Sequence, residues 1–347
     1  MGWQKMDKCK INHTTLKKIL IKKILISLFL ILSFYASSQF SPQVGINGSE
    51  AIPASCPLFK AWAQNAYVER GYLLLEDTSF TIANNNRTSY GTIENIYGPA
   101  DNKVLSLGDR GCATILLTEP LYNGIGWDFA IFENGFISPY DSSLAFLELA
   151  TVSVSSDGKN FVTFPCVSLT QDTIQITNFD FLDATKIHNL AGKYISNFGV
   201  PFDLDVLQDY YPSILDLNNI LYIRICDVGG SINPLLASYD SQGHIINDPY
   251  PSPFISGGFD LDAVGLRNIK QEDYVKIYPN PSKDIFYISS KKTINELIIS
   301  DLHGKILLKF KVNVNFSKIN LSFLKSGLYF CLLKINKDII VKKIILL

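Results

Sequence analysis

Two acidic side chains interrupt an apolar run in the sequence SGGFDLDAVGL, residues 256–266. Asp260 and Asp262 alternate with apolar residues there. Because successive side chains of a β-strand point to opposite faces, both carboxylates are predicted to lie on the same face. Two acids side by side could bind a metal ion, take part in chemistry, or hold neighbouring loops in place.

Other acids occur in similar positions near the ends of predicted strands. Calcium takes about six to eight oxygen ligands, and a group of acids at one edge of a sheet could supply them, although the spacing is not that of an EF-hand loop. The alternative is that each acid caps a turn or accepts backbone N–H groups at the base of a loop. The predicted ligands of a structural Ca²⁺ ion are Asp260, Asp262, Asp227, Glu133 and Asp128.

Sequence signals for catalysis are few. The chain has no HExxH, GxSxG or phosphate-loop motif. A glycosidase needs two carboxylates on either side of a sugar bond, but the sequence offers too many acids to select a pair. We therefore predict no catalytic residues, and a secreted glycan hydrolase stays the alternative.

Two long segments, residues 178–219 and 229–258, separate predicted strands and are rich in aromatic residues. Segments of this length inside a compact domain are usually functional or disordered, and their aromatic residues and prolines favour order. Aromatic side chains could stack on a flat ligand, or they could pack the segments onto the domain. The predicted ligand contacts are His188, Tyr194, Tyr239, Asp240, His244 and Tyr250.

Strand patterns dominate residues 40–270, and helical periodicity is weak, around residues 58–69. Asp157-Gly158 suits a two-residue hairpin turn. Many strands without alternating helices predict an all-β fold, a large jelly-roll-like β-sandwich of two packed antiparallel sheets. The predicted strands lie near residues 71–76, 103–107, 112–118, 127–132, 146–155, 160–165, 173–177, 220–227 and 259–266.

Charge is distributed unevenly along the chain. Residues 40–268 hold 25 acids and 10 bases, whereas residues 269–347 hold 6 acids and 14 bases, all of them Lys. The acidic region would repel nucleic acid and attract cations, so no nucleic-acid partner is predicted.

Four cysteines lie in the acidic region: Cys56, Cys112, Cys166 and Cys226. Residues 1–39 read as a secretory signal peptide, with a Lys-rich start, an apolar run and small residues before the expected cleavage point. Export permits disulfide bonds, but four cysteines allow three pairings and the sequence does not choose among them.

The last segment, residues 271–347, is predicted to form a small β-sandwich of about seven short strands. It contains Tyr278-Pro279-Asn280-Pro281, Asp301 with Gly304-Lys305, Ser326-Gly327-Leu328-Tyr329, and Lys342-Lys343, in that order. These motifs resemble the C-terminal sorting domain of the type IX secretion system of Bacteroidetes. The resemblance implies export across the outer membrane, the secretion machinery as a partner, and attachment to the cell surface or release.

Residues 45–268 contain phrases such as GWDFAIFENGF, YIRICDVGGSI and SGGFDLDAVGL. They resemble a largely uncharacterised family of secreted bacterial cell-surface proteins, similar to jelly-roll carbohydrate-binding and discoidin-like modules. The resemblance supplies no catalytic residues. It implies an exported binding protein for a glycan or another small ligand, with an outer-membrane uptake receptor as a further candidate partner. A structural adhesin is a third interpretation.

Overall fold

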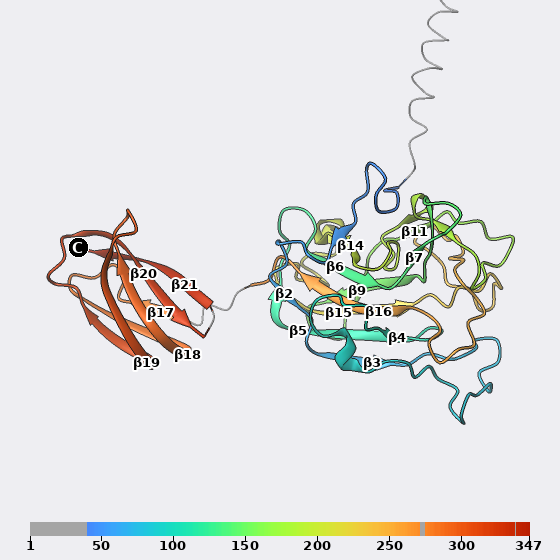
Figure 1. The fold of residues 1–347 in the computed structure, drawn as a ribbon, viewed down its shortest axis with the longest axis horizontal. Helices are drawn as coiled ribbons and strands as arrows, with labels where there is room; N and C mark the ends of the chain where they lie inside the picture. The colour runs from blue at the N-terminus through green and yellow to red at the C-terminus, as the bar shows by residue number, and fades with distance from the viewer. Residues whose placement is uncertain (1–39, 271–274, 337) are drawn as a thin grey trace, which may run out of the picture. The chain divides into compact units, whose positions relative to one another are not determined.

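The computed structural model describes residues 40–270, 275–336 and 338–347, and it divides between Lys270 and Gln271 into two units (Figure 1). The predicted signal peptide lies outside the described residues. Within the described parts of the chain, no helix is long and apolar enough to cross a membrane.

The central unit contains two antiparallel sheets. The first is ordered β1 (Ile52–Pro53), β14 (Phe198–Phe202), β6 (Phe129–Glu133), β16 (Asp260–Leu266) and β2 (Ala61–Trp62), and β4 (Leu105–Ser106) also pairs with β16. The second is ordered β10 (Val162–Thr163), β9 (Ala150–Ser155), β15 (Ile220–Asp227), β5 (Cys112–Leu121) and β3 (Ala66–Glu69).

One hydrophobic core joins the two sheets. Ile223 and Ile225 of β15 and Phe129 and Ile131 of β6 all belong to it and are almost completely buried. Each such side chain contributes roughly 1.5–3 kcal/mol when it leaves water, so the shared core is the main stabilising element of this unit. The predicted β-sandwich is confirmed.

Strand β16 is buried along its whole length. Leu261 and Val264 face the core between the sheets, whereas Ala263 packs with Phe132 in a separate cluster. Strict alternation would place Leu261 and Val264 on opposite faces, and the β6–β16 register shifts between Leu261 and Ala263. The irregularity therefore lies at Asp262, the second of the two acids, and reorients the strand there.

A smaller layer stands beside the sandwich and has its own core. It comprises a three-stranded sheet of β12 (Leu182–Asp183), β8 (Leu144–Phe146) and β7 (Phe136–Ile137), and the pair β11 (Val167–Ser168) and β13 (Ile187–His188). Three short 3₁₀ helices complete the unit: η1 (Ile93–Ile96), η2 (Ala184–Lys186) and η3 (Leu204–Tyr210).

Several local predictions were wrong. Residues 71–76 and 173–177 hold no strand. Residues 58–69, where helical periodicity is weak, hold β2 and β3, in keeping with the all-β prediction. The predicted two-residue turn at Asp157-Gly158 is a longer connection, because Val154 pairs with Val162. Asp157 instead accepts hydrogen bonds from the backbone N–H groups of the two residues after Gly158.

The segment 178–219 is also more regular than predicted, because it contains β14, an internal strand of the first sheet. Phe202 of this strand stacks on Phe129, with ring centroids 5.2 Å apart, and is fully buried. Some aromatic residues of this segment therefore pack it onto the domain.

One disulfide bond joins Cys112 to Cys226. The two residues are directly opposite each other on β5 and β15. Cys56, Cys166 and Cys331 are free thiols. The tertiary structure therefore selects one pairing that the sequence left open.

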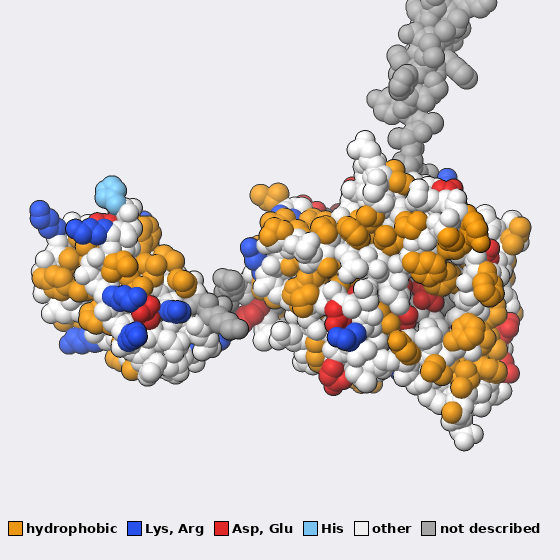
Figure 2. Space-filling model, viewed as in Figure 1, with side chains coloured by type: hydrophobic (Ala, Val, Ile, Leu, Met, Phe, Trp, Pro, Cys, Tyr) orange, Lys and Arg blue, Asp and Glu red, His pale blue; other side chains and the backbone are white. Residues whose placement is uncertain are grey.

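The C-terminal unit is a single five-stranded antiparallel sheet, where the sequence suggested more and shorter strands. Its strands are β17 (Val275–Tyr278), β18 (Ile285–Ser300), β19 (Ile306–Asn320), β20 (Gly327–Ile335) and β21 (Asp338–Leu346). Its core is largely aliphatic, and lysines are spread over the face that Figure 2 shows.

Candidate functional site

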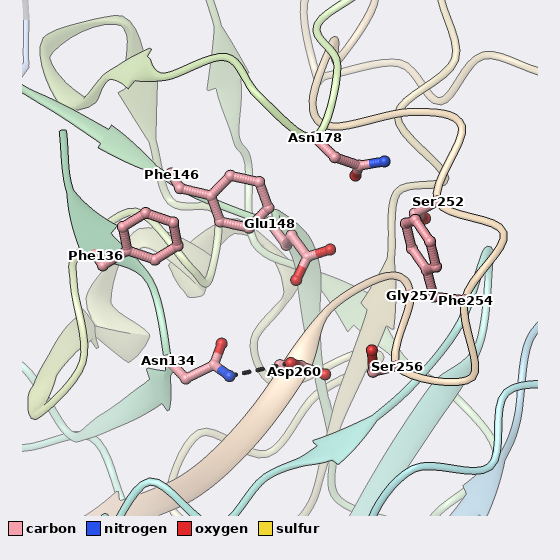
Figure 3. A pocket seen from close by; sticks show the side chains of 10 residues that line it. All are labelled: Asn134, Phe136, Phe146, Glu148, Asn178, Ser252, Phe254, Ser256, Gly257 and Asp260. Carbon is pink, nitrogen blue, oxygen red and sulfur yellow. Dashed lines mark hydrogen bonds between the residues drawn. The ribbon is translucent and has the colours of Figure 1, made fainter. Parts of the chain in front are cut away.

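A pocket of about 270 Å³ opens beside the start of β16. Its walls come from the end of β6, from β7 and β8, and from the loop that precedes β16. Ten residues line it: Asn134, Phe136, Phe146, Glu148, Asn178, Ser252, Phe254, Ser256, Gly257 and Asp260 (Figure 3).

Aromatic rings form two opposite walls of the pocket. Phe136 and Phe146 come from neighbouring strands and stack with ring centroids 5.2 Å apart and an interplanar angle of 15°. Phe254 lies on the other side, and its side chain is 53% exposed (Figure 3). Large apolar side chains rarely stay exposed in a concave site without a function, so the rings favour ligand contact.

A tight turn holds Phe254 in place. The Phe254 N–H donates to the carbonyl oxygen of Ser252 at 2.7 Å, and the Gly257 N–H donates to the carbonyl oxygen of Phe254 at 3.0 Å. A Cβ atom at Gly257 would overlap the Ser252 carbonyl oxygen, so the turn requires glycine at this position. Asn178 fixes the same loop by donating to the Pro251 carbonyl oxygen at 2.7 Å.

Glu148 points into the space between the aromatic walls (Figure 3). Glu148 is only 7% exposed, and its carboxylate makes no hydrogen bond or ion pair with any residue of the described chain. Burial, followed by the nearby charges of Asp260 and Glu133, raises the pKa of Glu148 well above its ordinary value. A carboxyl group that has a raised pKa and opens into a pocket is a candidate binding or reactive group.

Asp260 lies on the floor of the same pocket. Its carboxylate accepts hydrogen bonds from the Ser106 hydroxyl and from Asn134 Nδ2, the latter at 3.0 Å. Burial raises its pKa to about 6, although these two hydrogen bonds and the positive charge of Arg70 oppose the shift. The Arg70 guanidinium itself donates to backbone carbonyl groups, including that of Ser106.

Glu133 completes a group of three buried acids. Its Oε2 accepts the Gly135 N–H at 2.7 Å, while its Oε1 is buried with no partner in the described chain. Burial and then the charge of Asp260 raise its pKa well above the ordinary value. We call Glu133, Glu148 and Asp260 the acid cluster.

Two further acids position the residues next to the acid cluster. Asp248 accepts the Leu149 N–H at 2.8 Å, and Asp227 accepts the Phe259 N–H at 2.8 Å. Each therefore fixes the backbone immediately beside Glu148 or Asp260. Burial raises the pKa of Asp227 to about 6 and that of Asp248 well above its ordinary value.

The predicted calcium ligands are not gathered around one point. Asp262 accepts the N–H groups of Asp101 and Asn102 at 3.1 and 3.2 Å, and Asp128 accepts the N–H groups of Gly124 and Leu204 at 2.9 and 2.8 Å. Asp227 likewise accepts backbone N–H groups, and Asp260 and Glu133 belong to the acid cluster. Within residues 40–270 and the described C-terminal residues, no three His, Cys, Asp or Glu side chains are grouped to hold a metal ion.

These contacts match the alternative weighed from the sequence, in which acids accept hydrogen bonds at the bases of loops. The carboxylate oxygens of Asp262, Asp128 and Asp227 already accept hydrogen bonds from protein donors. The calcium ion stays a prediction without a located set of ligands.

The predicted ligand contacts lie elsewhere and have partners within the domain. The Tyr194 and Ser41 hydroxyls form a hydrogen bond of 2.7 Å, and His188 stacks on Phe40 with ring centroids 4.9 Å apart. The Tyr250 hydroxyl accepts the Glu76 N–H at 3.1 Å.

The remaining three lie together around one turn. His244 Nδ1 is 2.9 Å from Asp240 Oδ2, and the Tyr239 hydroxyl donates to the Pro234 carbonyl oxygen at 3.3 Å. None of the six predicted ligand contacts lines the pocket described above. Their ligand role stays a prediction.

Sequence reasoning singled out Asp260 among the pocket residues, and Phe254 lies in the aromatic segment 229–258 that it selected, but Glu148 was missed. The available signal was its position in FLELA, where one acid stands within an apolar run that reads as a buried strand. Phe136 and Phe146 were missed because an isolated Phe in a strand pattern is most often a core residue.

Comparison with known proteins identifies the C-terminal unit. Residues 276–347 match the family model described as a secretion system C-terminal sorting domain. No curated protein matches the chain.

Solved structures similar to this chain include the following three. One is the BSP domain of a biofilm-associated protein, with 9% identity, a TM-score of 0.18, and coverage of 68% of this chain and 48% of that one. Another is a Ruminococcus gnavus β-glucuronidase, with 10% identity, a TM-score of 0.19, and coverage of 69% of this chain and 36% of that one. The third is PorZ, a surface component of the type IX secretion system of Porphyromonas gingivalis. It has 10% identity, a TM-score of 0.19, and coverage of 76% of this chain and 47% of that one.

The chain spans half or less of the length of each of these solved proteins. The family match is independent of them. It covers the four motifs from Tyr278-Pro279-Asn280-Pro281 to Lys342-Lys343. Residues 276–347 are a type IX secretion sorting domain, which directs the protein across the outer membrane to the cell surface or the extracellular space.

Proposed function

We propose that the central unit is a ligand-binding domain that takes a glycan or another small ligand into the pocket. The observation that carries the proposal is the carboxylate of Glu148, which points into the pocket between aromatic walls and has no hydrogen-bond partner in the described chain. A ligand hydroxyl or amine could supply that partner. The aromatic rings would add apolar contact area on both sides of a flat ligand.

The sorting domain supports this proposal by placing the pocket outside the cell, where such a ligand is met. The expected partners are the type IX secretion machinery, through the C-terminal unit, and the ligand, through the central unit. An outer-membrane uptake receptor that accepts the bound ligand stays a further prediction.

The test is a binding screen by calorimetry with the full chain and a panel of oligosaccharides. For any ligand found, Phe254→Ala should weaken binding at least about tenfold, because it removes one wall of the pocket. The matched control is Phe179→Ala, which removes an aromatic ring that is 88% exposed in the same unit and does not line the pocket. Equal effects of the two variants, or no saturable binding at all, would contradict the proposal.

A glycan hydrolase is the second candidate, because two carboxyl groups with raised pKa values line one pocket. A general acid in a glycosidase needs a pKa raised in this way. Incubating each bound oligosaccharide with the full chain and analysing the products separates the two functions. Turnover that Glu148→Gln abolishes would favour the hydrolase, and intact ligand after long incubation would favour binding alone.

A further inference from the structure

The pocket is lined by acids without a basic residue. Two of its ten lining residues are carboxylic acids, and none is Lys, Arg or His. The neighbouring charges with the largest influence on the pKa of Glu148 are those of Asp260, Glu133, Asp248 and Asp227, and all of them are acids. The lining itself therefore supplies no cation to pair with Glu148.

One basic residue lies near Asp260, but it is not available to the pocket. Arg70 donates to the carbonyl oxygen of Gly91 at 2.6 Å and to that of Tyr90 at 2.8 Å, in addition to the Ser106 carbonyl. It is not among the lining residues. Its guanidinium is committed to backbone groups behind Asp260, so a positive charge in the pocket would have to come from a ligand.

The aromatic walls of the pocket suit a positively charged ligand. The face of an aromatic ring attracts cations within about 6 Å of its centroid, and organic ammonium groups are often held by aromatic side chains together with a carboxylate. Phe136 and Phe146 on one side, Phe254 on the other, and Glu148 between them form this combination (Figure 3).

We propose that the ligand carries an ammonium group, which sits between the Phe136–Phe146 pair and Phe254 with Glu148 as its counter-ion. The ammonium proposal rests on the proposed function, since it uses the same pocket, and it adds the chemical class of the ligand. An amino sugar and a small quaternary amine share the required group. A bare metal ion fits less well, because no three His, Cys, Asp or Glu side chains of the described residues are grouped to hold one.

The proposal implies a defined dependence on pH. The acids that line the ammonium site are Glu148 and Asp260, and the charges of Glu133, Asp248 and Asp227 act on Glu148 from outside the lining. All five have pKa values above their ordinary range, chiefly because they are buried. A cation binds better to the ionised acids, so binding releases protons and affinity should increase from pH 5 to pH 8.

Calorimetry with the full chain and four probes tests the proposal. Choline keeps its charge at every pH, and its neutral isostere 3,3-dimethylbutan-1-ol has the same shape without the charge. Glucosamine carries an ammonium group on a sugar, and glucose carries none. We expect each cation to bind at least about tenfold more tightly than its neutral counterpart, and choline to bind more tightly as the pH rises.

Glu148→Gln should abolish this preference for the cation while leaving the melting temperature equal or higher, since it removes a buried unpaired acid. The matched control is Asp172→Asn, which removes an exposed acid that does not line the pocket. It should leave all four affinities within about twofold of the original protein.

The outcomes separate the two proposals. Equal binding of glucose and glucosamine would overturn the ammonium proposal and leave glycan binding standing. Binding of choline but of neither sugar would support the ammonium proposal and exclude a sugar as the ligand. If none of the four probes binds, and calcium alone binds in a Glu148-dependent manner, the pocket is a metal site and the ammonium proposal fails. If nothing binds, the ammonium proposal fails, and the oligosaccharide screen alone decides the proposed function.

Discussion

The two units of this protein use their polar residues in opposite ways. The central unit buries many acids, among them Asp109, Asp227, Asp248 and the acid cluster. In the described part of the C-terminal unit, the buried polar residues are only Ser282 and Ser300, and the lysines remain on the surface. Burying a carboxyl group costs stability, so a unit that buries several must gain something other than stability from them.

The difference also appears in the strands. The C-terminal unit consists of strands of up to 16 residues joined by short turns, and its core is aliphatic. Most strands of the first central sheet have two to seven residues, and long irregular segments connect them. The comparison indicates a division of roles between the units. The C-terminal unit is a regular module for recognition by the export machinery, and the central unit has shorter strands and irregular segments that form a pocket. Four predictions test this division.

The largest effect is expected from removing the C-terminal unit. Deletion of residues 271–347 should abolish export across the outer membrane, because the sorting domain is the part that directs it. Fractionation of cells and medium followed by immunoblotting measures this. Phe254→Ala is the control and should be exported normally, and surface display of the truncated chain would contradict the division.

The next largest effect is expected from removing the disulfide of the central unit. Cys112 and Cys226 are 114 residues apart in sequence, and closing so long a loop restricts the unfolded chain. Changing both to Ala should lower the free energy of unfolding by about 2–5 kcal/mol.

Tryptophan fluorescence during urea denaturation measures this effect selectively, since Trp62 and Trp127 lie in the central unit and residues 271–347 contain no Trp. Cys331→Ala in the C-terminal unit is the control and should leave the tryptophan transition unchanged. An unchanged midpoint in the Cys112/Cys226 double variant would show that the bond does not stabilise the sandwich.

The stability of the central unit should decrease as the pH rises. Burial raises the pKa of Asp227, Asp260 and Asp262 to about 6 and that of Asp109 to about 8, against 3.8 for an ordinary Asp. The folded state therefore holds protons that the unfolded state releases above about pH 4. This contribution to stability is complete below that pH and is lost as the pH rises through 6 and then 8.

We expect the melting temperature from tryptophan fluorescence to decrease between pH 5 and pH 8 by an amount on the order of 5 °C. Asp260→Asn should reduce the slope, because it removes one of the titrating groups. A melting temperature that increases over this range would mean that the buried acids are ionised and stabilised in the folded protein.

The smallest effect is expected from calcium. Because Asp262, Asp128 and Asp227 already accept hydrogen bonds from the backbone, melting temperatures in millimolar calcium and in chelator should agree within about 1 °C. A clear increase with calcium that Asp262→Asn removes would restore the predicted structural ion and show that these loops rearrange around it.

Much of the fold could be predicted because alternation is a local property. Strand β15 has the predicted bounds, residues 220–227, and β16 begins one residue later than predicted. The prediction failed at residues 71–76 and 173–177, where apolar residues support loops in place of strands. It also missed β14, whose Gly199 and Pro201 are unusual in a strand, because pairing with β6 outweighs local preference there.

The candidate site was only partly predictable. Asp260 and Phe254 were recognised because an acid in a strand and an aromatic residue in a Pro-rich loop are locally unusual. Glu148 was missed because nothing near it in sequence shows that its carboxylate lacks a partner. The predicted ligand residues Tyr194 and Tyr250 are instead buried and hydrogen-bonded.

The sequence by itself determined the export route, the all-β architecture and the acidic character of the central unit, since motifs, alternation and composition can be read directly along the chain. Only the tertiary structure decided which acids share a pocket and which cysteines form a bond. Glu133 and Asp260 belong to β6 and β16, which are distant in sequence but adjacent in one sheet, where Leu261 is paired with Glu133. Such proximity depends on strand register, and register is set by the packing of the whole sandwich rather than by any local pattern.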